Sequence, residues 1–338
     1  MTATIKAVTV QKPGGLDKLT PTTLPDPGAP SRGEIRVRLH ATSLNYHDYA
    51  VAIGALPTPD GHIPMADGAG VVEAVGEGVT DFTEGDHVVS LFFPHWHDGP
   101  PQFGDFSTVP GDGVDGYARE AVVLPSHYFT KAPAGWSHAE AATITTAGLT
   151  AWRCLLEGGL KAGDDVLVLG TGGVSIYALQ IAQAFGARVF ATSSSDEKLA
   201  RVRKLGAAGI VNYKTDPAWG ETVAKLTGGR GVDIVIEVGG PATLGQSIAA
   251  GRVGATLSLV GVLTGRAGEV PTGALMRKNQ RLIGITVGSR AQQIDMVRAM
   301  EVTGIRPVID STFALANLAD AFRHEEAGAH FGKIAVTI

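Results

Sequence analysis

A glycine-rich turn carries the chemistry that is most easily recognised in this sequence. An apolar run, residues 166–169, leads into the turn, and apolar residues then recur at helical spacing up to Phe185. This pattern predicts a buried strand, a tight turn and a helix, where backbone N–H groups and the positive end of the helix dipole can hold an anion. Such a βα unit is typical of dinucleotide binding, although Ser175 replaces the third glycine of the usual fingerprint. The predicted phosphate-binding turn consists of Gly170, Thr171, Gly172, Gly173 and Val174.

Residues after the next predicted strand bear on which dinucleotide binds. That strand ends in Ser193, where an enzyme that selects NAD commonly has a carboxylate to accept hydrogen bonds from the ribose and to repel a 2′-phosphate. Ser194, Lys198 and Tyr213 lie close enough in the predicted order of elements to hold that phosphate. In a second interpretation Lys198 is solvated and Ser195 or Asp196 simply caps the helix, and Asp196 can also serve the ribose in an NAD-dependent enzyme. The sequence favours NADP(H) over NAD(H).

Composition excludes several classes of protein. The chain has 338 residues, of which 44% are hydrophobic, and this is enough for two domains with their own cores. Its formal net charge is −5 and it has no run of lysine or arginine, so we expect no nucleic-acid or membrane partner. No apolar run has the length of a membrane span, and the N-terminal residues lack a signal-peptide pattern, which predicts a cytoplasmic protein. The single cysteine, Cys154, forms no internal disulfide and no cysteine-clustered zinc site.

The first part of the chain reads as mostly β. A capping box, Ser137-His-Ala-Glu140, then predicts a helix that runs to about Leu156 and joins two domains. Between the last strands lies a long loop from Phe93 to Gly116, whose aromatic residues, including Trp96 and Phe103, either line a substrate cleft or pack locally. The strands are predicted at 5–12, 34–44, 69–76, 86–92 and 117–124.

From residue 165 strands and helices alternate, which predicts a doubly wound parallel sheet with helices on both faces. The tail beyond 290 is too short for a domain, so we expect its two helical segments and its strands near 307–313 and 333–338 to complete the first one. The domains are therefore 1–146 with 289–338, and 147–288. In the second domain strands are predicted at 165–170, 188–193, 209–213, 232–238, 255–261 and 281–288, and helices at 173–185, 196–205, 218–227 and 241–250.

With its parts in this order, the chain resembles the medium-chain dehydrogenase/reductase superfamily, in its zinc-independent, quinone-oxidoreductase-like or alcohol dehydrogenase-like branch. The resemblance spans essentially the whole length and implies a mostly β, GroES-like catalytic domain, a Rossmann domain and an active site between them. Besides the glycine turn it rests on Ser43-Leu-Asn-Tyr-His-Asp48, Asp67-Gly-Ala-Gly-Val-Val-Glu-Ala-Val-Gly76, Glu84-Gly-Asp-His-Val-Val89, Ala147-Gly-Leu-Thr-Ala-Trp152 and Gly332-Lys-Ile334.

The resemblance also bears on metal binding. Zinc-dependent relatives hold the catalytic metal with a cysteine at the position of Asn45, a histidine at Ala66, and a cysteine or aspartate at Thr146. An amide, a methyl group and a hydroxyl make a poor zinc set, since zinc favours thiolate and imidazole. We therefore expect no metal site and no zinc. His95 and His97 are interpreted as solvated or locally packed residues of the long loop.

Without a metal, hydrogen-bond donors must stabilise the negative charge that develops on the substrate oxygen. By the resemblance, Asn45, Tyr46 and His47 face the nicotinamide: Asn45 can donate to the substrate, Tyr46 can donate or stack, and His47 can deliver a proton. Asp48 is expected to orient this segment. The alternative for His47 is an ordinary histidine at a strand end.

The resemblance further assigns residues to the coenzyme. It implies that Thr150 packs against the nicotinamide, with Thr146 in the same binding set, and that Lys333 reaches the pyrophosphate; a solvated lysine at a strand end is the alternative. Gly239 and Gly261 lie at predicted strand ends, where backbone must approach the coenzyme.

The combined hypothesis is an NADP(H)-dependent oxidoreductase that transfers a hydride, without a metal, to a quinone or an α,β-unsaturated carbonyl. One alternative is a metal-free alcohol/carbonyl dehydrogenase on the same fold, and another is a nucleotide-binding redox sensor with little turnover. Strand 281–288 would be an exposed apolar edge in a monomer, which predicts a homodimer through that edge.

Overall fold

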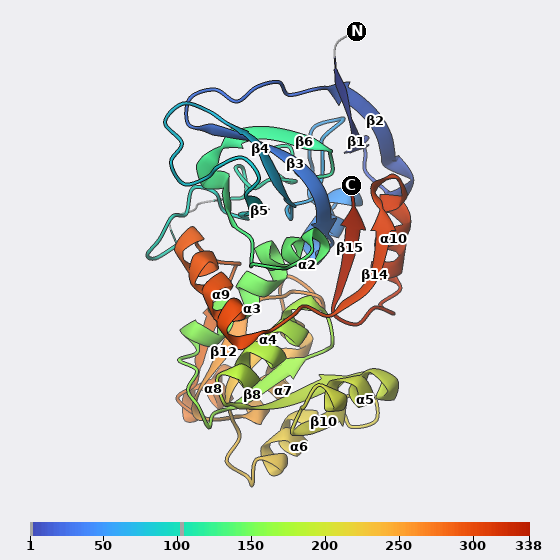
Figure 1. Ribbon diagram of the computed structural model, residues 1–338. Coiled ribbons are helices and arrows are strands. Elements are labelled where there is room, and N and C mark those ends of the chain that lie inside the picture. The colour runs from blue at the N-terminus through green and yellow to red at the C-terminus, as the bar shows by residue number, and fades with distance from the viewer. Residues whose placement is uncertain (1–2, 102–104) are drawn as a thin grey trace. The chain divides into compact units, whose positions relative to one another are not determined.

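The computed structural model of the chain describes residues 3–101 and 105–338, so Phe103 lies outside the described residues. The chain forms two compact units, each with its own sheet (Figure 1). Unit 1 comprises Met1–Leu149 and Val287–Ile338, and unit 2 comprises Thr150–Thr286. Among the described residues, no helix is long and apolar enough to cross a membrane.

Unit 2 contains a sheet of six parallel strands, as the alternating pattern predicts. Their order is β10-β9-β8-β11-β12-β13, and the chain reverses its direction of progress between β8 and β11. In doubly wound sheets the coenzyme binds beside such a point, at the carboxyl ends of the strands. The strands are β8 (Asp165–Leu169), β9 (Arg188–Ser193), β10 (Gly209–Asn212), β11 (Val232–Glu237), β12 (Gly251–Leu259) and β13 (Arg281–Gly284).

Helices cover this sheet because their apolar residues pack on its buried strands. Strands β8 and β11 are buried along their whole length, as expected for central parallel strands. One core cluster joins Leu167, Phe190 and Val235 to Trp219 and Leu244 of two helices. The helices are α4 (Gly173–Ala184), α5 (Asp196–Lys204), α6 (Trp219–Leu226), α7 (Pro241–Ala250) and α8 (Thr272–Arg277), of which only α8 is absent from the prediction.

The edge strand β13 is shorter than the predicted 281–288. It ends at Gly284, and Val287 has a left-handed φ of 42°, which is incompatible with a continuing strand. The strand does lie at the edge of the sheet, paired on one side with β12.

Unit 1 is built on a mostly antiparallel sheet with the order β14-β15-β3-β4-β5-β7, and β6 also pairs with β3. The C-terminal strand β15 pairs with β3, so the tail does complete the sheet formed by the first part of the chain. The strands are β3 (Glu34–Ser43), β4 (Ala69–Val75), β5 (His87–Ser90), β6 (Ala121–Pro125), β7 (Phe129–Lys131), β14 (Ile309–Ala314) and β15 (Lys333–Thr337), and a separate hairpin pairs β1 (Thr4–Val10) with β2 (Leu19–Pro25).

Alternating apolar residues form the core of this sheet. Ile35, Val37 and Leu39 on β3 are buried with Val72 of β4 and Phe129 of β7. The short elements β2, β7 and α1 (Tyr46–Ala52) are absent from the prediction, because three to seven residues give too little periodicity to recognise. Two further helices, α9 (Arg290–Thr303) and α10 (Leu318–Glu326), account for the helical segments of the tail.

The predicted helix 137–156 is divided into three parts. Ser137 and Glu140 form the expected capping box, in which the Ser137 N–H donates to Glu140 at 2.8 Å. Helix α2 (His138–Ala142) then gives way to a π-helical turn, Ile144–Gly148, before α3 (Leu149–Glu157). Such turns often occur at functional sites, and this one carries Thr146.

Candidate functional site

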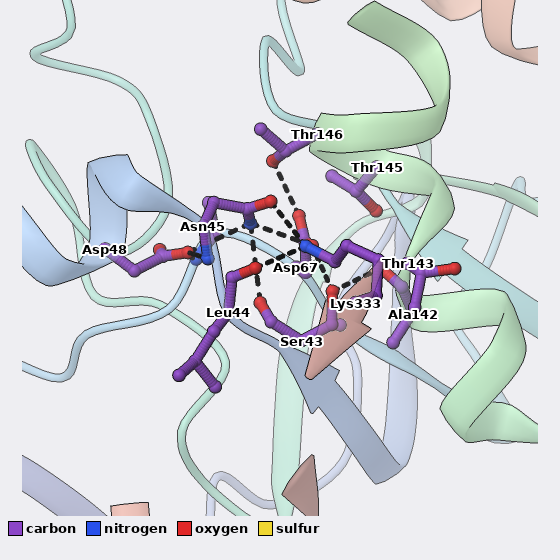
Figure 2. A network of polar contacts seen from close by, with 12 residues as sticks. Ser43, Leu44, Asn45, Asp48, Asp67, Ala142, Thr143, Thr145, Thr146 and Lys333 are labelled. Carbon is purple, nitrogen blue, oxygen red and sulfur yellow. Dashed lines mark hydrogen bonds and ion pairs between the residues drawn. The ribbon is translucent and has the colours of Figure 1, made fainter. Parts of the chain in front are cut away.

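A network of buried polar groups lies in unit 1 where β3 ends and α1 begins. Asn45 occupies the N-cap of α1, so Tyr46 and His47 lie in the first turn of a helix rather than at a strand end. Tyr46 is 53% exposed, whereas Asn45 is 9% exposed. The side chain of Asn45 therefore points into the protein, where it contacts Asp48 of its own segment and Asp67 and Lys333 of two distant ones (Figure 2).

Asp67, just before β4, is the hub of this network. Its carboxylate is fully buried and accepts hydrogen bonds from the Ser43 hydroxyl at 2.5 Å, the Asn45 amide at 2.9 Å and the Thr146 hydroxyl at 2.6 Å. A buried carboxylate is costly unless it is paired and hydrogen-bonded. Three donors and a nearby cation meet that requirement here.

The cation is Lys333, the first residue of β15, whose side chain is 4% exposed. Its Nζ donates to the backbone oxygen of Leu44 and, at 2.6 Å, to Oδ1 of Asn45, and it lies 3.7 Å from the Asp67 carboxylate. The ammonium thus lies among three oxygen atoms of unit 1, in the centre of Figure 2. Lys333 was expected to reach the coenzyme pyrophosphate. In the structure its ammonium instead contacts groups of unit 1.

Asp48 binds the same segment from the other side. Its carboxylate accepts from the backbone and side-chain N–H groups of Asn45, both at 3.0 Å, and from the backbone of Ala66 at 2.8 Å. These are contacts of the kind expected of a residue that orients this segment. Burial, with the neighbouring charge of Asp67, raises the pKa of Asp48 to about 6.

The contacts of Asn45 differ from those expected of a donor to substrate. Its Oδ1 accepts from Lys333, and its two amide hydrogens have the carboxylates of Asp48 and Asp67 as acceptors. No N–H of Asn45 is therefore left to donate to a substrate oxygen. The amide instead holds the two carboxylates and the ammonium in position. Thr146, expected in the coenzyme-binding set, likewise donates its hydroxyl hydrogen to Asp67.

His47 has a partner that the sequence did not indicate. Its Nε2 lies 3.3 Å from a carboxylate oxygen of Asp112, in the long loop, and both side chains are mostly buried. The ring contacts the edges of Phe92 and Phe106. Phe93 and Trp96 are buried and pack with the same aromatic group, as the local-packing alternative predicts.

In unit 2 the predicted coenzyme residues follow the carboxyl ends of the parallel strands. Gly170 follows β8 and has a φ of 73°, which favours glycine, and the turn leads into α4 at Gly173. A Cβ at Gly172 would meet nothing within 4 Å, so open space lies over the turn that a pyrophosphate would occupy. Ser175 fits where a third glycine is usual, because its hydroxyl donates to the backbone oxygen of Leu169 at 2.6 Å.

The residues proposed to choose between NAD and NADP lie on adjoining strands. Ser193 ends β9, and its backbone oxygen accepts from the N–H of Tyr213, which follows β10. Lys198 is half-buried in the first turn of α5, which Ser195 caps. The Asp196 carboxylate accepts from the Asn212 side chain at 2.7 Å. No carboxylate stands at the end of β9 itself.

Glycines after β11 and β12 have a structural explanation inside unit 2. Gly239 and Gly240 donate their N–H groups to the buried carboxylate of Glu237, at 2.7 and 3.0 Å. Thr243 and Ser247 donate their hydroxyls to the same carboxylate. A Cβ at Gly261 would lie 2.0 Å from the Val238 oxygen. Close packing therefore explains the glycine at 261 by itself, whether or not a coenzyme also approaches this backbone. Thr150, which was predicted to pack against the nicotinamide, is buried.

Three of the important residues were not predicted as site residues: Asp67, Asp112 and Glu237. Asp67 is the first residue of the motif Asp67–Gly76, and an acidic residue directly before a buried strand is a signal that could have identified it. Asp112 gave no signal, because its partner His47 is far away in the sequence. Glu237 ends an apolar strand, and one residue separates it from a pair of glycines, which is a local pattern that marks a carboxylate able to bind the turn.

Comparison with known proteins identifies the family. A family model described as zinc-binding dehydrogenase matches residues 173–302, and one described as alcohol dehydrogenase GroES-like domain matches residues 31–134. A zinc-type alcohol dehydrogenase-like protein of Schizosaccharomyces pombe is 42% identical, with 96% of each chain covered.

Solved structures agree. A protein of Sinorhizobium meliloti 1021, provisionally assigned as an alcohol dehydrogenase, is 40% identical with a TM-score of 0.93, and both chains are covered completely. An NAD-dependent alcohol dehydrogenase is 35% identical with a TM-score of 0.89, covering 98% of this chain and 99% of its own. The chain belongs to the medium-chain dehydrogenase/reductase superfamily and is an NAD(P)-dependent oxidoreductase.

The zinc in the family description does not fit the residues of this chain. Asn45, Ala66 and Thr146 offer an amide, a methyl group and a hydroxyl, and the Asn45 oxygen already accepts from the Lys333 ammonium. Within residues 3–101 and 105–338, no three histidine, cysteine or acidic residues are grouped so that they could hold a metal ion.

Proposed function

We propose that this protein catalyses NADP(H)-dependent, metal-free hydride transfer to a quinone or an α,β-unsaturated carbonyl compound. The observation that carries the proposal is the Lys333 ammonium, bonded to Leu44 and Asn45 and close to Asp67. A positive charge is already present where the zinc-dependent relatives have metal-binding side chains. The site therefore lacks both the donors and the electrostatic need for a zinc ion.

The preference for a conjugated acceptor follows from charge. A bound nicotinamide coenzyme supplies the hydride, and negative charge then develops on the substrate oxygen. A quinone or an enone spreads that charge over several atoms, so hydrogen-bond donors suffice where a simple ketone needs stronger polarisation. Tyr46, with its exposed phenol, is the proposed donor to substrate, because the Asn45 amide hydrogens are engaged.

His47 is the proposed proton donor. Imidazole is a common proton donor and acceptor in enzymes, and Nε2 of His47 lies 3.3 Å from the Asp112 carboxylate. The contacts with Phe92 and Phe106 hold the ring in one orientation. In the proposed step, the substrate oxygen that receives the developing charge takes the proton of Nδ1, the ring nitrogen that does not face Asp112, and the ring is left neutral.

The coenzyme preference rests on the strand ends of unit 2. Ser193 ends β9 without a carboxylate, and Lys198 and Tyr213 are the proposed partners of a 2′-phosphate. The Asp196 side chain, which an NAD-dependent enzyme would direct at the ribose, is hydrogen-bonded to Asn212. These features support NADP(H).

A second candidate function is a metal-free alcohol or carbonyl dehydrogenase. It is favoured by the NAD-dependent alcohol dehydrogenase that is 35% identical over nearly the whole chain. The two candidates differ in substrate and in coenzyme, so one experiment separates them.

The test uses the purified chain after dialysis against a strong chelator, with metal content measured on the same sample. NADPH and NADH are each offered with a quinone, an enone and a simple ketone, and NADP⁺ and NAD⁺ with alcohols. The proposal expects turnover of the quinone or enone with NADPH in metal-depleted protein. Turnover of alcohols alone supports the second candidate, and loss of all turnover that zinc restores contradicts a metal-free reaction. Tight coenzyme binding without reduction of any acceptor indicates a redox-sensing protein.

We also infer a homodimer that pairs through the edge strand β13. Leu282 and Ile283 are only partly buried there, and an unpaired edge strand favours pairing with a second copy. Light scattering at micromolar concentration should give twice the monomer mass, and a monomeric mass would contradict the inference.

A further inference from the structure

The buried charges around Asn45 come from distant segments of unit 1. Asp67 is fully buried and Asp48 lies on the other side of the Asn45 amide, while Lys333 brings the positive charge from the C-terminal strand. An ammonium withdrawn from water needs acceptors for its three N–H groups. The Leu44 oxygen, Asn45 Oδ1 and the Asp67 carboxylate are available to it.

This shell has the composition of a small cation site. A backbone oxygen, an amide oxygen and a carboxylate oxygen are the ligands that hard divalent cations prefer in proteins. The shell also includes Asn45, one of the three positions that bind zinc in the zinc-dependent relatives. A second of them, Thr146, is linked to the shell through its hydrogen bond to Asp67.

We propose that the Lys333 ammonium is the resident cation of this site and takes the place of the zinc ion of the zinc-dependent relatives. The inference rests on the proposed metal-free function and deepens it. Lys333 neutralises Asp67 and, by bonding Oδ1 of Asn45, directs the amide hydrogens toward Asp48 and Asp67. It is a positioning residue, and it excludes a second cation by occupying the same oxygen atoms and by charge repulsion.

A zinc-grafting experiment tests this placement. Two chains are compared: one carries Asn45→Cys and Ala66→His, and the other carries these two changes with Lys333→Met. Zinc affinity is measured by competition with a chelating dye, without any activity assay. With Lys333 present, we expect zinc binding weaker by at least about a hundredfold, because two cations would share one shell. Equal affinities, or no zinc bound by either chain, would overturn the proposal.

A second measurement keeps the native ligand residues and guards against grafts that do not fold. Lys333→Met alone leaves the Asp67 carboxylate without its cation, and we expect its melting temperature to fall by about 10 °C. Mn²⁺ or Mg²⁺ should restore several degrees of that loss by entering the vacated oxygen shell. The charge-neutral pair Lys333→Met with Asp67→Asn should recover about half of the loss and show no metal response.

Lys278→Met is the matched control. The Lys278 ammonium also donates to backbone oxygens, those of Ile248, Ala249 and Gly251, but no carboxylate is among its partners in the described part of the chain. Its melting temperature should not respond to divalent cations. An equal response of Lys278→Met and Lys333→Met, or none from either, would contradict the proposal. Turnover of the unaltered, metal-depleted enzyme tests the proposed function separately, so the two can fail independently.

Discussion

Each unit of this oxidoreductase has a buried carboxylate in its candidate site, and the hydrogen-bonding needs of the two carboxylates are met in different ways. Glu237 in unit 2 accepts from Gly239, Gly240, Thr243 and Ser247, all within ten residues along the chain. Asp67 in unit 1 accepts from donors as far away as residue 146, and its cation comes from residue 333.

The difference concerns both distance and charge. The partners of Glu237 are neutral, and all of them lie in the turn after β11 or on the following helix α7. The partners of Asp67 include an ammonium and meet only when the C-terminal strand β15 has joined β3. Removing one member of a buried ion pair leaves the other charge uncompensated, whereas neutralising Glu237, whose partners are uncharged, leaves no unpaired charge behind. Charge-neutralising substitutions should therefore separate the two centres.

The largest effect is expected for Asp67→Asn. It leaves the Lys333 ammonium buried without its carboxylate and should lower the free energy of unfolding by about 3–5 kcal/mol. Urea denaturation followed by circular dichroism measures this loss. A loss no larger than that of Glu237→Gln would remove the proposed distinction between the two centres.

Lys198→Ala should weaken coenzyme binding. Because a charge-assisted hydrogen bond contributes about 1.5–3 kcal/mol, the Michaelis constant for NADPH should rise about ten- to a hundredfold, with little change for NADH. Steady-state kinetics with both coenzymes measure the effect. Lys204→Ala, an exposed position on the same helix, is the control. Equal changes with both coenzymes would rule out a 2′-phosphate contact.

Glu237→Gln should cost only about 1 kcal/mol, since the glutamine oxygen can still accept from the two glycine N–H groups and from Thr243. Its amide can donate to the Ser247 hydroxyl, which accepts as well as it donates. Thermal unfolding measures the change. A loss of several kcal/mol would show that the negative charge of Glu237 itself stabilises the turn. That result would contradict the view that neutral hydrogen bonds suffice there.

A third carboxyl group, that of Glu325 on α10, makes the stability of the protein depend on pH. Glu325 on α10 has an oxygen without a hydrogen-bond partner, and burial raises the pKa of Glu325 from 4.5 to about 7, although the charge of Lys333 opposes the shift. The folded state therefore keeps a proton that the unfolded state loses, and stability is lost as the pH rises from about 4.5 to about 7. Glu325→Gln should remove this loss, so its advantage over the unaltered protein should grow across that window. A difference in unfolding free energy between Glu325→Gln and the unaltered protein that is the same at pH 4.5 and at pH 7 would contradict this prediction.

Most of the fold could be predicted from the sequence. Alternating strands and helices specified the six-stranded sheet of unit 2, because long periodic elements carry a strong signal. Short elements such as α1 and β7, and the π-helical turn at Thr146, could not be predicted, since neither length nor periodicity marks them. The strand 281–288 was predicted too long, because apolar residues continue beyond Gly284 while Val287 adopts a turn conformation.

The candidate site divides along the same line. The turn at Gly170 and its helix were determined by the sequence itself, because a glycine with positive φ and a following helix act on adjacent residues. The contacts of Asn45 and Lys333, by contrast, were decided by tertiary structure alone. A lysine that ends a loop reads equally as solvated or as coenzyme-binding, and only the pairing of β15 with β3 brings its ammonium to Asn45 and Asp67. Long-range pairing of charges leaves no pattern in one sequence, since each partner is specified by a strand that lies far away along the chain.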